Sequence, residues 1–142
     1  WDEVTLSGTV ESFSGGTQLG SVSLGMVHGP AAQMITPSVV NIGDLEEAYE
    51  GCLVALESIH VDSENPDAPG GDYGEWSVSD GTNSVRVDDK WDYYYFPVEG
   101  HELAYIEGVV EGFKKLEGCE RYVIRVDRKV WAGEGRGWHA GS

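Results

Sequence analysis

Carboxylates are the most abundant side chains in this sequence that could do chemistry, and four of them share one short segment. Residues 62–74 place these four among prolines and glycines, which is typical of a polar loop. Hard cations need several oxygen ligands, which such a loop supplies together with Asn65 and backbone carbonyls. The spacing is not that of an EF-hand, so two interpretations stay open: a calcium site and a solvated acidic loop. The candidate calcium ligands are Asp62, Glu64, Asp67 and Asp72.

Catalytic side chains in a usable arrangement are missing from the sequence. Nucleophilic catalysis by Ser-His-Asp or Cys-His sets needs a positioned histidine, and the four histidines are scattered. The same scatter provides no zinc set. In a chain with 25 Asp and Glu residues, two carboxylates close together do not indicate glycosidase chemistry. We therefore expect a protein that is not an enzyme. The histidines are His28, His60, His101 and His139.

The two cysteines, Cys52 and Cys119, each lie beside a strand-like segment. Two is the minimum for one disulfide bond in an oxidising compartment. We predict a Cys52–Cys119 bridge, with free buried thiols as the alternative. On the chain-entropy model, closing so long a loop contributes about 4 kcal/mol.

Aromatic side chains concentrate at residues 91–96. Exposed rings of this kind stack on sugars or bases, or pack against a neighbouring subunit. The net charge of −16 would repel a phosphate backbone, so nucleic acid is not an expected partner. A sticky surface for carbohydrate or a subunit, and rings that cap a barrel, both remain open. The predicted binding residues here are Trp91, Tyr93 and Tyr95.

Short alternating segments separated by turns predict that the fold is all-β. The clearest element is a hairpin of residues 75–79 and 84–88 around Asp80-Gly81, in which Trp76 and Val78 face Val87 and Val85. A capping-box pattern predicts one short helix over residues 44–50. The other predicted strands are residues 4–13, 21–26, 52–61, 103–113 and 121–130.

Residues 4–13 and 104–113 echo each other, through shared ancestry or through convergence on similar sheet positions. In both cases a glycine lies in mid-strand, where a coiled strand needs a bend or a close backbone approach. The matched pairs are Gly8 and Gly108, Val10 and Val110, Glu11 and Glu111, and Phe13 and Phe113.

Residues 42–130 contain patterns such as Tyr73-Gly74-Glu75-Trp76 and Gly108-Val109-Val110. Through them the chain resembles OB-fold-like modules of large secreted bacterial proteins, which occur beside extracellular nuclease, phosphatase or lamin-tail-like domains. The resemblance implies an OB-like Greek-key β-barrel with one short helix and an extra N-terminal strand or hairpin, and it implies no activity. In such modules a segment like residues 4–19 looks like the closing strand of a preceding module. The runs that carry the resemblance are 44–54, 73–82, 85–89, 108–110 and 115–117.

Three segments are expected. Residues 1–28 form an N-terminal strand or hairpin that contacts other subunits, residues 29–131 form the barrel, and residues 132–142 are a Gly-rich tail. The chain opens at Trp1 with no leader, so we expect a secreted, extracellular protein whose signal peptide has been removed. No apolar run is long enough to span a membrane.

These features favour a non-enzymatic extracellular subunit that self-assembles into a filament, tube or sheath through its ends, because an unpaired strand edge is a template for another chain. The alternative is a carbohydrate- or protein-binding accessory module of a secreted bacterial hydrolase. The predicted contact residues at the two ends are Val4, Leu6, Val10, Phe13, Trp131 and Trp138.

Overall fold

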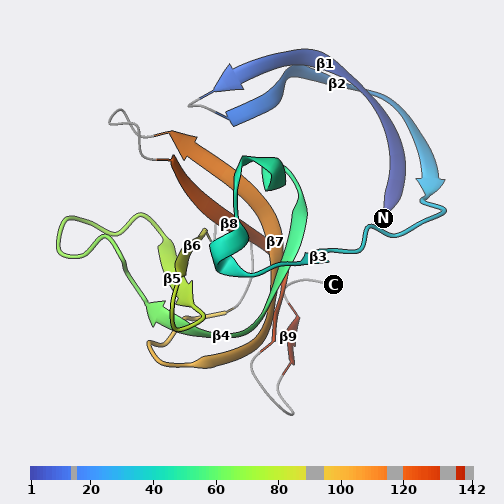
Figure 1. Cartoon of the computed structure of the whole chain (residues 1–142). Coiled ribbons are helices and arrows are strands. Elements are labelled where there is room, and N and C mark those ends of the chain that lie inside the picture. The colour runs from blue at the N-terminus through green and yellow to red at the C-terminus, as the bar shows by residue number, and fades with distance from the viewer. Residues whose placement is uncertain (14–15, 89–94, 115–119, 132–136, 140–142) are drawn as a thin grey trace.

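The computed structural model describes residues 1–13, 16–88, 95–114, 120–131 and 137–139, and within them the fold is all-β, as predicted (Figure 1). Two sheets contain all the described strands. The strands are β1 (Asp2–Phe13), β2 (Gly16–Pro30), β3 (Ser38–Val39), β4 (Leu53–Ser63), β5 (Glu75–Ser79), β6 (Ser84–Asp88), β7 (Glu102–Lys114), β8 (Glu120–Trp131) and β9 (Gly137–His139).

The larger sheet is organised around β4, which pairs with β7 along residues 53–60 and with β5 along residues 60–63. From β5 the pairing continues to β6, then in parallel to β8, and from β8 to β7, which pairs again with β4. The short strands β3 and β9 extend β4 and β8. The predicted hairpin forms as β5–β6, with Trp76 opposite Val87 and Val78 opposite Val85.

The core lies on the inner face of this curved sheet. It consists of aliphatic side chains packed around the indole ring of Trp76. Trp76 is 1% exposed and its ring centroid lies 5.3 Å from that of Tyr95. Burial of this kind stabilises a fold because it removes apolar area from water. Other fully buried core residues are Val54, Leu56, Ile59, Val61, Val78, Val87, Leu103, Ile106, Val110 and Ile124.

The helix predicted over residues 44–50 instead forms two single-turn 3-10 helices, η1 (Ile42–Asp44) and η2 (Glu47–Tyr49). Neither has a side-chain cap, and Asp44 accepts a hydrogen bond from the Asn41 amide instead. Leu45 interrupts the helical run with an extended backbone, ψ 120°, and packs against the core. Core packing at this position therefore outweighs the local helix signal.

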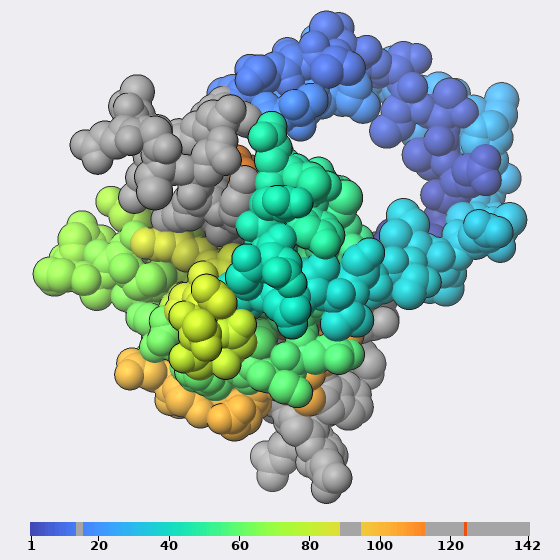
Figure 2. Space-filling model, in the orientation of Figure 1, coloured from blue at the N-terminus to red at the C-terminus, as the bar shows by residue number. Residues whose placement is uncertain are grey.

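Strands β1 and β2 form a separate two-stranded sheet, which we call the N-terminal hairpin. It arches clear of the rest of the molecule over most of its length (Figures 1 and 2). β1 has 12 residues and β2 has 15, and the register shifts at three places along the pair. Because each bulge adds a residue to one strand and bends it, the hairpin curves into an arc.

Candidate functional site

The N-terminal hairpin presents an apolar face to solvent. Cross-strand partners share a face of a hairpin, and the register pairs Val4 with Val27, Leu6 with Leu24, and Val10 with Leu19. Every residue of β1 is exposed, and Val10 is 71% exposed. Exposed apolar side chains that share one face of a sheet indicate an interaction surface. The large exposed hydrophobic residues of the hairpin are Val4, Leu6, Val10, Phe13, Leu19, Val22, Leu24, Met26 and Val27.

Polar contacts hold the two strands together beside this apolar face. Gln18 donates a hydrogen bond to the Glu11 carboxylate at 2.7 Å, and Thr5 Oγ1 lies 2.7 Å from His28 Nε2. The hairpin touches the body of the molecule near its turn, where the Thr17 N–H donates to Glu50. An isolated two-stranded hairpin is marginally stable in water, so this element gains from a partner.

The predicted contact residues Val4, Leu6, Val10 and Phe13 all lie on this hairpin. The sequence analysis missed their partners on β2, chiefly Leu19 and Val27. Alternation marked residues 21–26 of that strand, and three register shifts, which fall at residues 20–23, 24–26 and 27–29 of β2, interrupt the period of two. The side chains of Trp131 and Trp138 lie outside those that the structure describes.

A polar groove of about 540 Å³ lies where η1 meets β4, β5 and β6. Its apolar lining comes from Ile42, Leu45 and Val85. Asp62 accepts hydrogen bonds there from the hydroxyls of Ser77, at 3.4 Å, and Ser84, at 3.2 Å. The groove therefore offers hydroxyl and carboxylate groups that suit a polar ligand.

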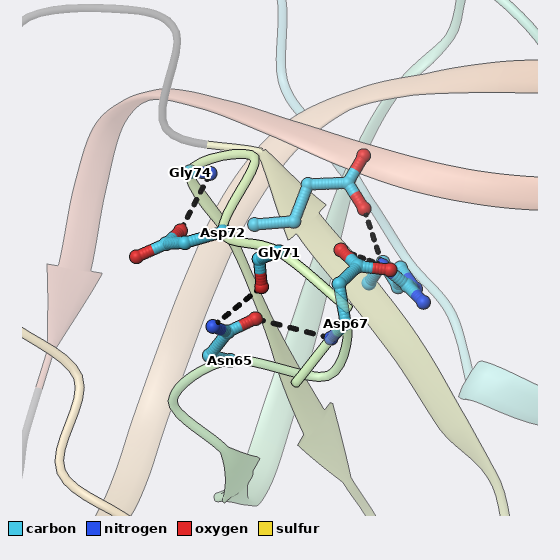
Figure 3. A network of polar contacts seen from close by, with 7 residues as sticks. Asn65, Asp67, Gly71, Asp72 and Gly74 are labelled. Carbon is cyan, nitrogen blue, oxygen red and sulfur yellow. Dashed lines mark hydrogen bonds and ion pairs between the residues drawn. The ribbon is translucent and has the colours of Figure 1, made fainter. Parts of the chain in front are cut away.

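Arg86 on β6 ties the loop of residues 64–74 to the sheet. Its Nη1 atom lies 2.6 Å from Asp67 Oδ2 and 2.8 Å from Glu75 Oε2, and all three side chains are largely buried (Figure 3). The hydrogen bond with Asp67 raises the pKa of Arg86 above its usual value; Glu75 adds to this effect and burial opposes it. The guanidinium thus supplies one positive charge that these two carboxylates share.

Hydrogen bonds within the loop complete this network. Asn65 donates to the carbonyl of Gly71 and accepts from the backbone N–H of Asp67, and Asp72 accepts from the backbone N–H of Gly74 (Figure 3). The loop is therefore a structured Asx-type turn, in which short side chains take the place of backbone partners.

The structure does not bring the four predicted calcium ligands together. Asp67 is paired with Arg86, Asp62 faces the groove, Asp72 binds its own loop, and Glu64 accepts from the backbone N–H of Glu99. Among the residues that the structure describes, no three carboxylate, histidine or cysteine side chains form a group that could hold a metal. Calcium binding stays a prediction.

Tyr95 belongs to the core and not to an exposed binding surface. It is 8% exposed, and its hydroxyl lies 2.8 Å from His101 Nδ1. Burial raises the pKa of Tyr95 to about 12. Of the open alternatives for residues 91–96, its position agrees with a ring that caps the core. Trp91 and Tyr93 lie outside the described residues. Two other rings are exposed: Phe96, which belongs to the aromatic run of residues 91–96, and Tyr73, which was not predicted as a binding residue.

Cys52 is exposed and forms no disulfide with any residue that the structure describes, and its Sγ lies 3.9 Å from the Ala48 carbonyl oxygen. This exposure differs from the buried thiol that was the alternative to a disulfide. Cys119 lies outside the described residues, so the Cys52–Cys119 bridge stays a prediction.

Comparisons of the chain with protein-family models, with curated proteins and with solved structures gave no significant match. In the part of the chain that the structure describes, no helix is both long enough and apolar enough to cross a membrane.

Proposed function

We propose that this protein is a non-enzymatic extracellular subunit that assembles with other copies of itself through its N-terminal hairpin. The observation that carries the proposal is the apolar face of β1 and β2, which is exposed along a sheet of only two strands. Among the described strands none pairs with the outer edges of that sheet, so these edges can accept an added strand.

The resemblance to OB-fold-like modules of secreted bacterial proteins supports this class of function. In this proposal the OB-like Greek-key part of the chain consists of the strands β4, β5, β6, β8 and β7, which include one parallel pair. Such a fold is a scaffold, and its function depends on the surfaces that it carries.

Electrostatics set a condition on assembly. A chain with a net charge of −16 repels its own copies, whereas apolar contact and backbone pairing at the hairpin need no charged partner. We therefore expect association to strengthen with salt, which screens the repulsion over about 8–10 Å at 0.1–0.15 M.

Deletion of residues 1–30 tests the proposal. This variant should stay folded, because the buried core lies in the larger sheet, and it should remain monomeric in light scattering and electron microscopy at high salt. Deletion of residues 132–142 tests the other end of the chain, and Val98→Ser, at an exposed loop position, is a control that should assemble normally. Assemblies of unchanged size from the hairpin deletion would refute the proposal.

A carbohydrate- or protein-binding accessory module is the second candidate function, and the polar groove favours it. Glycan binding that is lost in Ser84→Ala, in a chain that stays monomeric at high salt, would support this candidate over self-assembly.

A further inference from the structure

The N-terminal hairpin and the β7–β8 hairpin share an irregularity at the same place. The register of β1 with β2 shifts between Ser7 and Thr9, and the register of β7 with β8 shifts between Glu107 and Gly108. The echoed glycine lies at each shift, and the extra residues belong to the second strand in both hairpins. At Gly8 a Cβ would lie 3.1 Å from the Gly20 carbonyl oxygen, so the close approach there favours glycine.

Aligning the two hairpins on this bulge places apolar side chains at matching positions. Leu6 matches Ile106 and Val10 matches Val110 in the first strands, and Leu19 matches Ile124 in the second. The environments differ completely. Leu6, Val10 and Leu19 are 48%, 71% and 50% exposed, whereas Ile106, Val110 and Ile124 are 0%, 1% and 0% exposed.

The cover over β7–β8 is a three-stranded sheet, β4-β5-β6. Its strand β4 pairs antiparallel with the outer edge of β7, where Leu56 lies opposite Ile106. Its strand β6 pairs in parallel with the outer edge of β8, where Val87 lies opposite Ile124. In the part of the chain that the structure describes, the corresponding edges of β1 and β2 have no strand beside them.

We infer that the N-terminal hairpin is a closing hairpin for a partner molecule, and that the partner contributes a three-stranded sheet of the β4-β5-β6 kind. One outer strand of that sheet pairs antiparallel with β1, the other pairs in parallel with β2, and its apolar inner face covers Leu6, Val10 and Leu19. The 12 and 15 residues of the hairpin match the roughly 20–30 residues that each side of a standard interface uses.

The inference shares with the proposed function only that the hairpin is the attachment element, and it differs in the partner, which is not an intact copy of this chain. A second intact copy of this chain is a poorer fit, because its own β7 and β8 already occupy the edges of β4 and β6. The partner is therefore a sheet that lacks a closing hairpin of its own.

A fusion of this chain to a vacant sheet tests the inference. Residues 38–101, which contain β3 to β6 and the segment that leads to β7, are placed directly ahead of Trp1 of the full chain. Hydrogen exchange is then compared between the fusion and the unfused chain. Linking the two parts raises their effective concentration to the millimolar range. We expect the outer-edge amides of β1 and β2 to exchange at least about 100-fold more slowly in the fusion.

Matched variants separate docking from nonspecific contact. The double variant Leu6→Glu/Val10→Glu in the fusion should abolish the slow exchange of the outer-edge amides. The larger sheet should stay folded in this variant, because both residues are exposed. Ser7→Glu in the fusion should retain the slow exchange, because β7 has Glu107 at the equivalent position. Outer-edge amides that exchange equally fast with and without the fused sheet would overturn the inference.

The oligomeric state of the unfused chain distinguishes this inference from the proposed function. A monomeric chain whose hairpin is protected in the fusion supports the inference and refutes self-assembly. Assemblies of the unfused chain in which the outer-edge amides are already protected would identify a second copy as the occupant and overturn the inference.

Discussion

Leu6 and Ile106 occupy equivalent positions in two hairpins of one chain, yet Leu6 is 48% exposed and Ile106 is completely buried. Ile106→Ala should therefore lower the free energy of unfolding by about 2–5 kcal/mol, because it leaves a cavity in the core. Leu6→Ala should change it by less than about 0.5 kcal/mol. Urea unfolding of the two variants at low salt measures the difference, and equal losses would contradict the exposed position of the hairpin.

Removal of the Arg86 guanidinium should loosen the loop that follows β4. Arg86→Met leaves the carboxylates of Asp67 and Glu75 largely buried without their counter-charge, which should cost about 1–3 kcal/mol. The double variant with Asp67→Asn should recover part of this loss, because one buried charge is then neutral. A double-mutant cycle in urea measures the coupling, and strictly additive losses would contradict the pairing.

Alkaline pH should destabilise the fold through Tyr95. Burial raises its pKa to about 12, whereas a tyrosine in an unfolded chain ionises near about pH 10. The folded state holds the proton more tightly, so this stabilisation is complete below about pH 10 and is lost as the pH rises towards about 12. The free energy of unfolding should fall over that window, by up to about 1.4 kcal/mol per pH unit for this group.

Two tyrosine variants isolate the contribution of Tyr95. Tyr95→Phe should flatten the decline above about pH 10, although Tyr105, whose pKa is also raised, by burial first and by its hydrogen bond to Glu107, contributes in the same direction. Tyr73→Phe is the control, because its ring is 74% exposed. An identical decline in wild type and Tyr95→Phe would show that Tyr95 does not govern it.

Calcium binding to the loop of residues 62–74 should be weak, with dissociation at millimolar concentration, because Arg86 already provides a counter-charge for Asp67. Arg86→Gln should tighten the binding by removing a positive charge that competes with calcium for that carboxylate. Calorimetric titration after chelation, with melting temperatures measured in parallel, tests both statements. Neither heat nor a shift in melting temperature at millimolar calcium would count against a site here.

Local signals in the sequence were sufficient for the class of fold and for most strands. The β5–β6 hairpin was predictable because its turn is encoded by neighbours: Asp80 accepts from the backbone N–H groups of Thr82 and Asn83, and Gly81 has a φ of 93°. Alternation with a period of two likewise marked β1 and the core of β6, since cross-strand packing selects apolar residues at every second position.

Tertiary structure decided what those elements do. Asp67 and Arg86 are 19 residues apart, and nothing local marks them as partners. Tyr95 lies in the core and not on a binding surface because the body of the sheet places Trp76 against it. The two echoed strands have nearly the same pattern, but β7 is covered by β4 whereas β1 is exposed. Residue patterns determine which side chains favour burial, whereas the presence of a covering sheet depends on contacts far apart in the chain or on another molecule.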